Sequence, residues 1–348
     1  MSLRFGATDK RFPLRWWIVS ISAIAIAVLI GVCVGAVNIA PTHAIGALLN
    51  NIPGVHIGTT DEITSSIIWD IRTPRVVLAL LVGSMLATAG CAYQGTFRNP
   101  LADPYFLGVS AGAGLGATIE IVLVSSAAQW TLPLAAFLGA MLAVLMTYSL
   151  GRSAVVGRSS TSLILAGVAV AALLTALQTL ITARNSDKVQ QVYTWILGRL
   201  ATAGWSDVLM VTPYVIICSV VLVKYRRVLD VFAVGDEEAQ SLGLNVGKAR
   251  ATIIGAASLG TAAVVSVTGL IGFVGIIVPH TVRLVVGNSY RVVLPLSIVF
   301  GGVFLVFADL IARTALSPEE IPIGVITALI GAPFFLYLLA SRKQGSLI

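Results

Sequence analysis

The 348-residue sequence has little charge: charged residues make up 11% of the chain, whereas an ordinary soluble domain has about 25%. Hydrophobic residues make up 57%, and the mean hydropathy is +0.96. A single water-soluble core could not bury this much apolar surface, so the composition excludes an ordinary soluble protein. The apolar-polar alternation of a membrane β-barrel is also missing, which leaves helices as the membrane-spanning elements.

Cysteine and histidine are scarce, with three of each. Cys33, Cys91 and Cys218 lie inside apolar runs, where a cysteine is usually a small core residue. Their spacing matches neither a disulfide framework nor a metal site. The histidines are scattered, so we predict no metal site and no cofactor bound by this chain.

Long apolar runs are abundant, and ten of them approach the roughly 20 residues that a helix needs to cross a bilayer. The third is rich in glycine and the eighth is short, so these two are the weakest candidates. The first run follows a basic segment, residues 1–15, but it is too long for a signal peptide and lacks a cleavage site. The predicted spans are Trp16–Val37, Val76–Tyr93, Leu107–Val124, Leu132–Leu150, Leu163–Ile181, Val208–Val223, Ala251–Leu270, Gly272–Gly287, Val292–Ile311 and Ile323–Leu339.

The distribution of lysine and arginine predicts the orientation. With the N-terminus in the cytoplasm, 16 of the 22 basic residues fall in inner segments and 6 in outer segments. We therefore predict an all-α polytopic membrane protein, one domain over residues 1–348, with both termini in the cytoplasm. The net charge of +7 then reflects topology, and no nucleic-acid partner is expected.

Two connecting segments have helical signatures. Residues 185–201 repeat apolar side chains at helical spacing, which predicts an amphipathic helix on the outer membrane surface or, equally, a helix packed on its neighbours. Residues 236–243 begin with Asp236, Glu237 and Glu238 and end at Gly243. Acidic residues suit the first turn of a helix and glycine suits its end, so a short cytoplasmic helix is expected there.

Two glycine patterns resemble nucleotide-binding motifs but predict something else. Gly108, Gly112 and Gly116 are four residues apart in an apolar run with no preceding strand, which favours close helix packing. Gly243 to Ala249 lacks the spacing and the hydroxyl residue of a phosphate-binding loop. We therefore expect no ATP binding by this chain.

Charged residues inside or beside the spans are few, and such residues are often functional. Glu120 lies in the third span, and it is a candidate either to line a path or to reach the membrane interface. Asp309 lies four residues before Arg313, which favours a structural ion pair. Arg72 and Arg75 precede the second span on the outer side, where arginines often simply extend to the interface.

Several motifs together resemble the FecCD/BtuC family of permeases, and they run in the same order over nearly the whole chain. They are Arg72-Thr-Pro-Arg75, Gln94-Gly-Thr-Phe-Arg-Asn-Pro-Leu-Ala-Asp-Pro104, Leu107-Gly-Val-Ser110, Leu165-Ala-Gly-Val168, Trp195-Ile-Leu-Gly198, Gly235-Asp-Glu-Glu238, Ser241-Leu-Gly-Leu-Asn-Val246, Gly272-Phe-Val-Gly275, Val278-Pro-His280, Ala308-Asp-Leu-Ile-Ala-Arg313 and Ile330-Gly-Ala-Pro333.

The resemblance implies a permease subunit of an ATP-binding-cassette (ABC) importer for iron-siderophores, haem or cobalamin, with an iron chelate favoured. It implies pairing with a second permease, as a homodimer or heterodimer, and with two ATPase subunits that bind ATP and Mg. It also implies delivery by an extracytoplasmic binding protein and a location in the cytoplasmic membrane of a bacterium.

The resemblance also implies roles for individual residues. Arg72, Arg75 and Arg313 would meet the binding protein. The segment with Asp236, Glu237, Glu238, Ala239, Leu242 and Gly243 would dock on the ATPase, and Ser160 and Thr161 would belong to the cytoplasmic gate. A secondary carrier that needs no ATPase is the alternative from a different class. An enzyme is not expected, because no nucleophile or metal set is evident.

Overall fold

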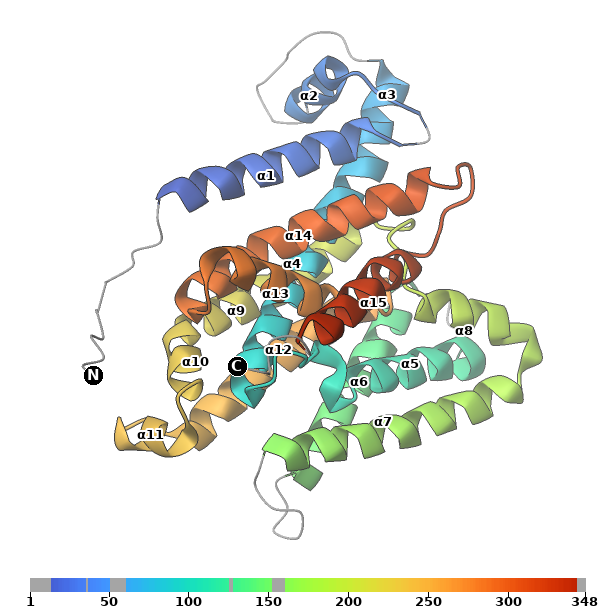
Figure 1. Ribbon diagram of the computed structural model, residues 1–348. Helices are drawn as coiled ribbons and strands as arrows, with labels where there is room; N and C mark the ends of the chain where they lie inside the picture. Colours follow the sequence, from blue (N-terminus) through green and yellow to red (C-terminus); the bar gives the residue numbers. More distant parts are fainter. Residues whose placement is uncertain (1–13, 36, 51–60, 125–127, 152–159, 343–348) are drawn as a thin grey trace.

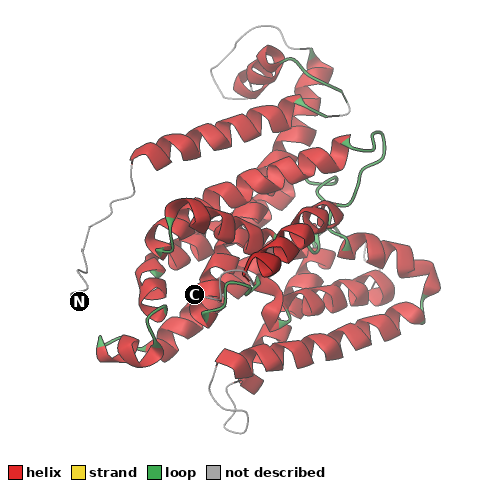
Figure 2. Ribbon diagram, in the orientation of Figure 1, coloured by secondary structure: helices red, strands yellow, loops and turns green. Residues whose placement is uncertain are grey.

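A computed structural model describes residues 14–35, 37–50, 61–124, 128–151 and 160–342 (Figure 1). Within these ranges every regular element is a helix (Figure 2). The α-helices are α1 (Leu14–Cys33), α2 (Pro41–Asn50), α3 (Glu62–Ser66), α4 (Thr73–Phe97), α5 (Val109–Ile119), α6 (Thr131–Gly151), α7 (Ser160–Ala183), α8 (Val189–Ile196), α9 (Trp205–Lys224), α10 (Arg226–Phe232), α11 (Asp236–Ser241), α12 (Val246–Thr268), α13 (Val274–Val286), α14 (Tyr290–Thr314) and α15 (Ile323–Arg342). Four short turns are π-helical, η1 (Ile67–Arg72) and η3 (Glu120–Val124), or 3₁₀-helical, η2 (Pro104–Leu107) and η4 (Ser186–Lys188).

The number of spans agrees with the sequence prediction. Seven helices of the described chain are long and apolar enough to cross a membrane, and three shorter apolar helices accompany them. The shorter ones include the two weakest predicted spans, in α5 and α13. The second span is longer than predicted, because α3 and η1 continue into α4 and the helical stretch runs over Glu62–Phe97. The prediction of about ten membrane helices is therefore confirmed.

Helix α4 occupies the centre of the bundle and packs on α9, α12, α13 and α14 (Figure 1). Small residues let these helices approach one another at backbone distance. A Cβ atom on Gly83 would lie 2.2 Å from the carbonyl oxygen of Gly301, and one on Gly90 would lie 2.1 Å from that of Gly275. Only glycine fits at these contacts, so they fix α4 against α13 and α14.

A second group of helices, α5, α6 and α7, packs together beside this core, with α8 next to α5 and α7. The glycine pattern of α5 has the packing role predicted from the sequence. Cβ atoms on Gly112 and Gly116 would lie 2.3 and 2.1 Å from backbone oxygens of α6. The alternative of a dinucleotide-binding turn is excluded, because these glycines fill a helix-helix contact.

Candidate functional site

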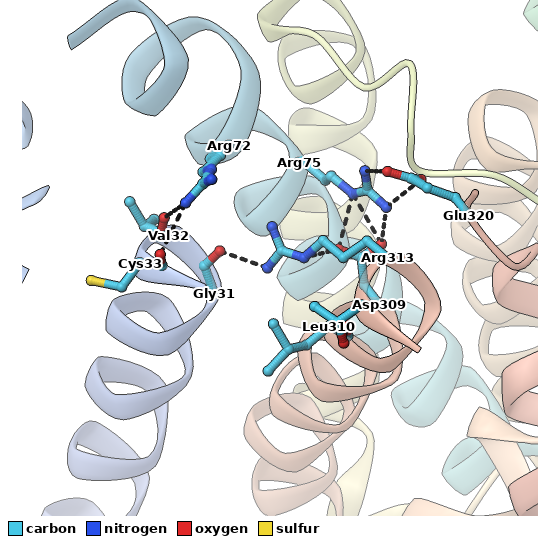
Figure 3. Close-up of polar contacts among 10 residues, drawn as sticks. Gly31, Val32, Cys33, Arg72, Arg75, Asp309, Leu310, Arg313 and Glu320 are labelled. Carbon is cyan, nitrogen blue, oxygen red and sulfur yellow. Dashed lines mark hydrogen bonds and ion pairs between the residues drawn. The ribbon is translucent and has the colours of Figure 1, made fainter. Parts of the chain in front are cut away.

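Arg72 holds the end of α1. Its guanidinium donates hydrogen bonds to the carbonyl oxygens of Val32 at 2.8 Å and Cys33 at 3.0 Å (Figure 3). It also donates to the carbonyl oxygen of Val37. The last carbonyls of a helix have no partner inside the helix and form the negative end of its dipole. Arg72 therefore supplies both hydrogen bonds and a positive charge at the C-terminal end of α1.

Arg75 and Arg313 share one buried acidic partner, Asp309. Arg75 contacts both oxygens of Asp309 at 2.8–3.0 Å, and its other face contacts Glu320 at 2.8 and 2.9 Å (Figure 3). Arg313 donates to the carbonyl oxygen of Gly31 at 2.6 Å, and its Nε lies 3.7 Å from Asp309. The sequence predicted the pairing of Asp309 with Arg313, but not the closer contact with Arg75.

We call Arg72, Arg75, Arg313, Asp309 and Glu320 the arginine cluster. The structure brings together the three arginines that were singled out in the sequence, but it buries them: their exposed fractions are 7%, 7% and 6%. Arginines extended into the membrane interface would be exposed, so that interpretation is wrong. The cluster ties α1, α4 and α14 together, and Glu320 is a member that the sequence did not indicate.

The short acidic helix exists as predicted, over Asp236–Ser241. It ends in a Schellman motif, in which Leu244 N–H donates to Ala239 and Gly243 N–H donates to Gln240. Gly243 has a φ of +81°, a conformation that glycine adopts without steric cost. The predicted role of Gly243 as the helix end is confirmed.

The side chains of this helix face different ways. Glu237 and Glu238 are exposed and Leu242 is 73% exposed. Ala239 is fully buried under the helix, so its side chain cannot contact another subunit. Its expected place among the docking residues is therefore corrected to an internal packing role. Asp236 is held by ion pairs from Arg98 and Arg250.

The two expected gate residues begin α7. Helix α7 starts at Ser160, and Thr161 is exposed in its first turn. The loop before them, residues 152–159, lies outside the described residues. The assignment of Ser160 and Thr161 to a gate stays a prediction.

Glu120 does not lie on an open surface. Its side chain is buried and accepts a hydrogen bond from the hydroxyl of Thr131, the first residue of α6, at 2.8 Å. A carboxylate enclosed between α5 and α6 joins these two helices. Of the roles considered from the sequence, neither the path-lining group nor the interfacial group fits this placement.

The outer segment predicted over residues 185–201 forms η4 and the eight-residue helix α8. Trp195 is 4% exposed, and the indole N–H of Trp205 donates to the carbonyl oxygen of Trp69 at 3.0 Å. The tryptophans therefore pack on the protein. This arrangement agrees with the alternative of a helix packed on its neighbours, while Tyr193 on the opposite side is exposed.

A hollow of about 540 Å³ lies between α5, α7 and α8. Its lining is mostly small, apolar or hydroxyl-bearing, with Thr175, Thr179 and Thr182 on one face of α7 and a single amide, Gln178. No acidic or basic side chain is among the described residues that line it. In the described ranges no group of three or more His, Cys, Asp and Glu residues could hold a metal ion.

The comparisons with known proteins identify the family. Residues 23–341 match the FecCD transport family. The chain belongs to this family. It is 41% identical to the cobalamin import system permease protein BtuC of Halobacterium salinarum, over 94% of this chain and 91% of that protein. It is 35% identical to the Fe(3+)-citrate import system permease protein YfmE of Bacillus subtilis, over 97% and 98% of the two chains.

The fold also matches a solved transporter structure. A chain of an ABC transporter of the metal-chelate type, solved in an inward-facing conformation, superposes with a TM-score of 0.82 at 27% identity and covers 94% of this chain and 100% of that chain. The hemin transport system permease protein HmuU of Yersinia pestis is 37% identical over 80% of this chain and 84% of that protein. Members of the FecCD transport family are permeases, so this chain is a multi-pass transport protein.

Proposed function

We propose that this chain is the membrane-spanning permease subunit of an ABC importer for a metal chelate. The observation that carries the proposal is the match, over 80–97% of this chain, to permeases named for cobalamin, iron-citrate and hemin import. In this account ATP and Mg bind to two separate ATPase subunits, and an extracytoplasmic binding protein delivers the chelate. The transporter would work in the cytoplasmic membrane of a bacterium.

Iron chelates and cobalamin are both candidate substrates. The sequence resemblance favours an iron chelate, whereas the relative at 41% identity is named for cobalamin. The hollow beside α7 supports a path with little chemical selectivity, since its lining is neutral. The binding protein would then select the substrate, and the permease would admit a bulky chelate of either kind.

Docking of the binding protein is proposed over the ends of α1, α4 and α14, where the arginine cluster lies. Three guanidinium groups there face two carboxylates, so the cluster attracts acidic side chains. Because the arginines are buried, they would attract the binding protein through their electrostatic field and not by direct contact. They would also fix the shape of this surface. A second permease subunit is proposed against α7. In an 18-residue apolar part of this helix only 17% of the residues are buried.

The ATPase is proposed to bind the exposed side of α11, with Glu237, Glu238 and Leu242 as contacts. Co-expression of the chain with its ATPase and purification through a tag on either one tests this role. The two proteins should co-purify, and Leu242→Arg should reduce co-purification or separate ATP hydrolysis from uptake. A secondary carrier would instead transport the chelate without any ATPase, and Leu242→Arg would then have no effect.

A further inference from the structure

Asp236 is the first residue of α11 and the meeting point of two arginines from other helices. Its Oδ1 lies 2.6 Å from Nη2 of Arg98, and its Oδ2 lies 2.9 Å from Nη2 of Arg250. Arg98 follows the last residue of α4, and Arg250 lies in the first turns of α12. We call these three residues the Asp236 clamp.

The clamp adds a direct link from α11 to α4. Helix α11 packs on α10 and α12, and the Arg98–Asp236 ion pair joins it to α4 as well. The Arg250 guanidinium is itself held over the ring of Phe232, at 5.6 Å from the ring centre. One carboxylate thus connects the short helix to two long helices of the core.

The backbone at Arg98 indicates that this link is built in. Arg98 has φ 51° and ψ 34°, the left-handed conformation that caps the end of α4. Glycine is the usual residue at such a position, because a side chain there is sterically unfavourable. Arginine at this position is therefore less favourable for stability than glycine would be. Its side chain is the group that reaches Asp236.

Helix α4 also reaches the opposite side of the molecule. Its 25 residues span about 37 Å at 1.5 Å per residue. Arg75, in its first turn, belongs to the arginine cluster. A single helix buried in the core therefore has an ion-pair cluster at each end, one beside α14 and one beside α11.

We propose that the Asp236 clamp is the positioning element that transmits movement of α11 to α4 and α12. The proposal rests on the proposed function, in which α11 receives the movement of the ATPase. Arg98 and Arg250 touch neither ATP nor substrate in this account; they act through Asp236. Without the clamp, α11 would still bind the ATPase through its exposed side. A displacement of α11 would then no longer move α4 and α12.

Arg98→Gly is the sharpest test, because it removes the guanidinium and the unfavourable backbone conformation together. Asp236→Asn keeps the size of the side chain and removes only the charge. Lys248→Gln is the matched control, since Lys248 lies in the first turn of α12, is exposed and has no ion pair in the described structure. The full transporter with its ATPase and binding protein is reconstituted in liposomes for all variants.

We expect Arg98→Gly to fold, co-purify with the ATPase and melt no lower than the wild type. The number of ATP molecules hydrolysed per imported substrate should rise at least about fivefold in Arg98→Gly and Asp236→Asn, the lower end of ordinary coupling effects, and stay unchanged in Lys248→Gln. The double variant should be no worse than the more severe single variant, because both single variants already remove the Arg98–Asp236 ion pair.

If Arg98→Gly and Asp236→Asn both hydrolyse the same number of ATP molecules per imported substrate as the wild type, the proposed role of the clamp is wrong. If Leu242→Arg still separates hydrolysis from uptake in that case, the proposed function stands and only the clamp fails. If Leu242→Arg is also without effect and the ATPase does not co-purify, the proposed function itself fails.

Discussion

Arg75 of α4 and Asp309 of α14 form a buried ion pair, with Nη2 and Oδ1 2.8 Å apart and side-chain exposures of 9% and 2%. The Arg75 guanidinium also contacts Glu320. It therefore joins α4 to α14 and to the loop that follows α14. Paired charges in an apolar surrounding depend on each other, because either one alone is costly to bury.

Arg75→Ala should therefore destabilise the protein by about 3–5 kcal/mol, since it leaves the Asp309 carboxylate with only the longer contact to Arg313. Glu320→Gln is the matched comparison. The Glu320 side chain is 38% exposed, so loss of its charge should lower the free energy of unfolding by no more than about 1 kcal/mol. Thermal unfolding of the purified protein in detergent measures both. Equal melting temperatures for Arg75→Ala and the wild type would contradict the internal role.

Arg75→Lys separates this internal role from docking. Lysine keeps the charge but cannot form the bidentate contacts of the guanidinium. The variant should melt at a lower temperature while the association rate of the binding protein, measured by surface plasmon resonance, stays close to that of the wild type. A reduced association rate with unchanged melting would instead make Arg75 a direct docking contact.

The sequence predicted the spans because their apolar runs are long, and it predicted α11 because the signals for its start and end are local. It could not predict the partners of Arg72, since the carbonyls of Val32 and Cys33 lie about 40 residues away in the chain and carbonyl groups leave no trace in a sequence. The burial of Ala239 was missed for a similar reason. A six-residue helix is too short for its apolar pattern to show which side faces the core.

Gly243→Val should disrupt the end of α11, because a β-branched residue is strained at a φ of +81°. A Cβ at this position meets no atom within 4 Å, so the effect comes from the backbone alone. More ATPase should co-purify with Gly243→Asn than with Gly243→Val, since asparagine tolerates the left-handed conformation. Equal losses for the two variants would contradict this explanation.

Asp103, which lies between α4 and α5, gives stability a pH dependence. Burial raises the pKa of this carboxyl from 3.8 to about 6, although its hydrogen bond from Tyr105 N–H acts in the other direction. The folded state therefore favours the protonated form, and stability should fall as the pH rises from about 4 to 6, by up to about 3 kcal/mol from this group.

Asp103→Asn keeps the acceptor for Tyr105 and cannot ionise. The variant should match the wild type at pH 4 and be more stable than it at pH 7, as measured by thermal unfolding in detergent. A difference between the two proteins that is the same at both pH values would show that the charge of Asp103 does not cause it.

The orientation can be tested by cysteine labelling, because Cys33, Cys91 and Cys218 are all buried and contribute little background. Asp187→Cys, in the exposed segment before α8, should react with an impermeant maleimide added to intact cells. Lys248→Cys, exposed beside α11, should react only after the cells are opened. Labelling of Lys248→Cys in sealed cells would reverse the predicted orientation.

Transport by the reconstituted complex is the most direct test of the proposed function. Liposomes containing this chain and its ATPase, with the binding protein outside, are supplied in turn with ferric citrate, haem and cobalamin, with and without enclosed ATP. We expect one metal chelate to accumulate, only with ATP inside and with both the ATPase and the binding protein present. Accumulation by the permease alone, without the ATPase, would contradict the proposed function.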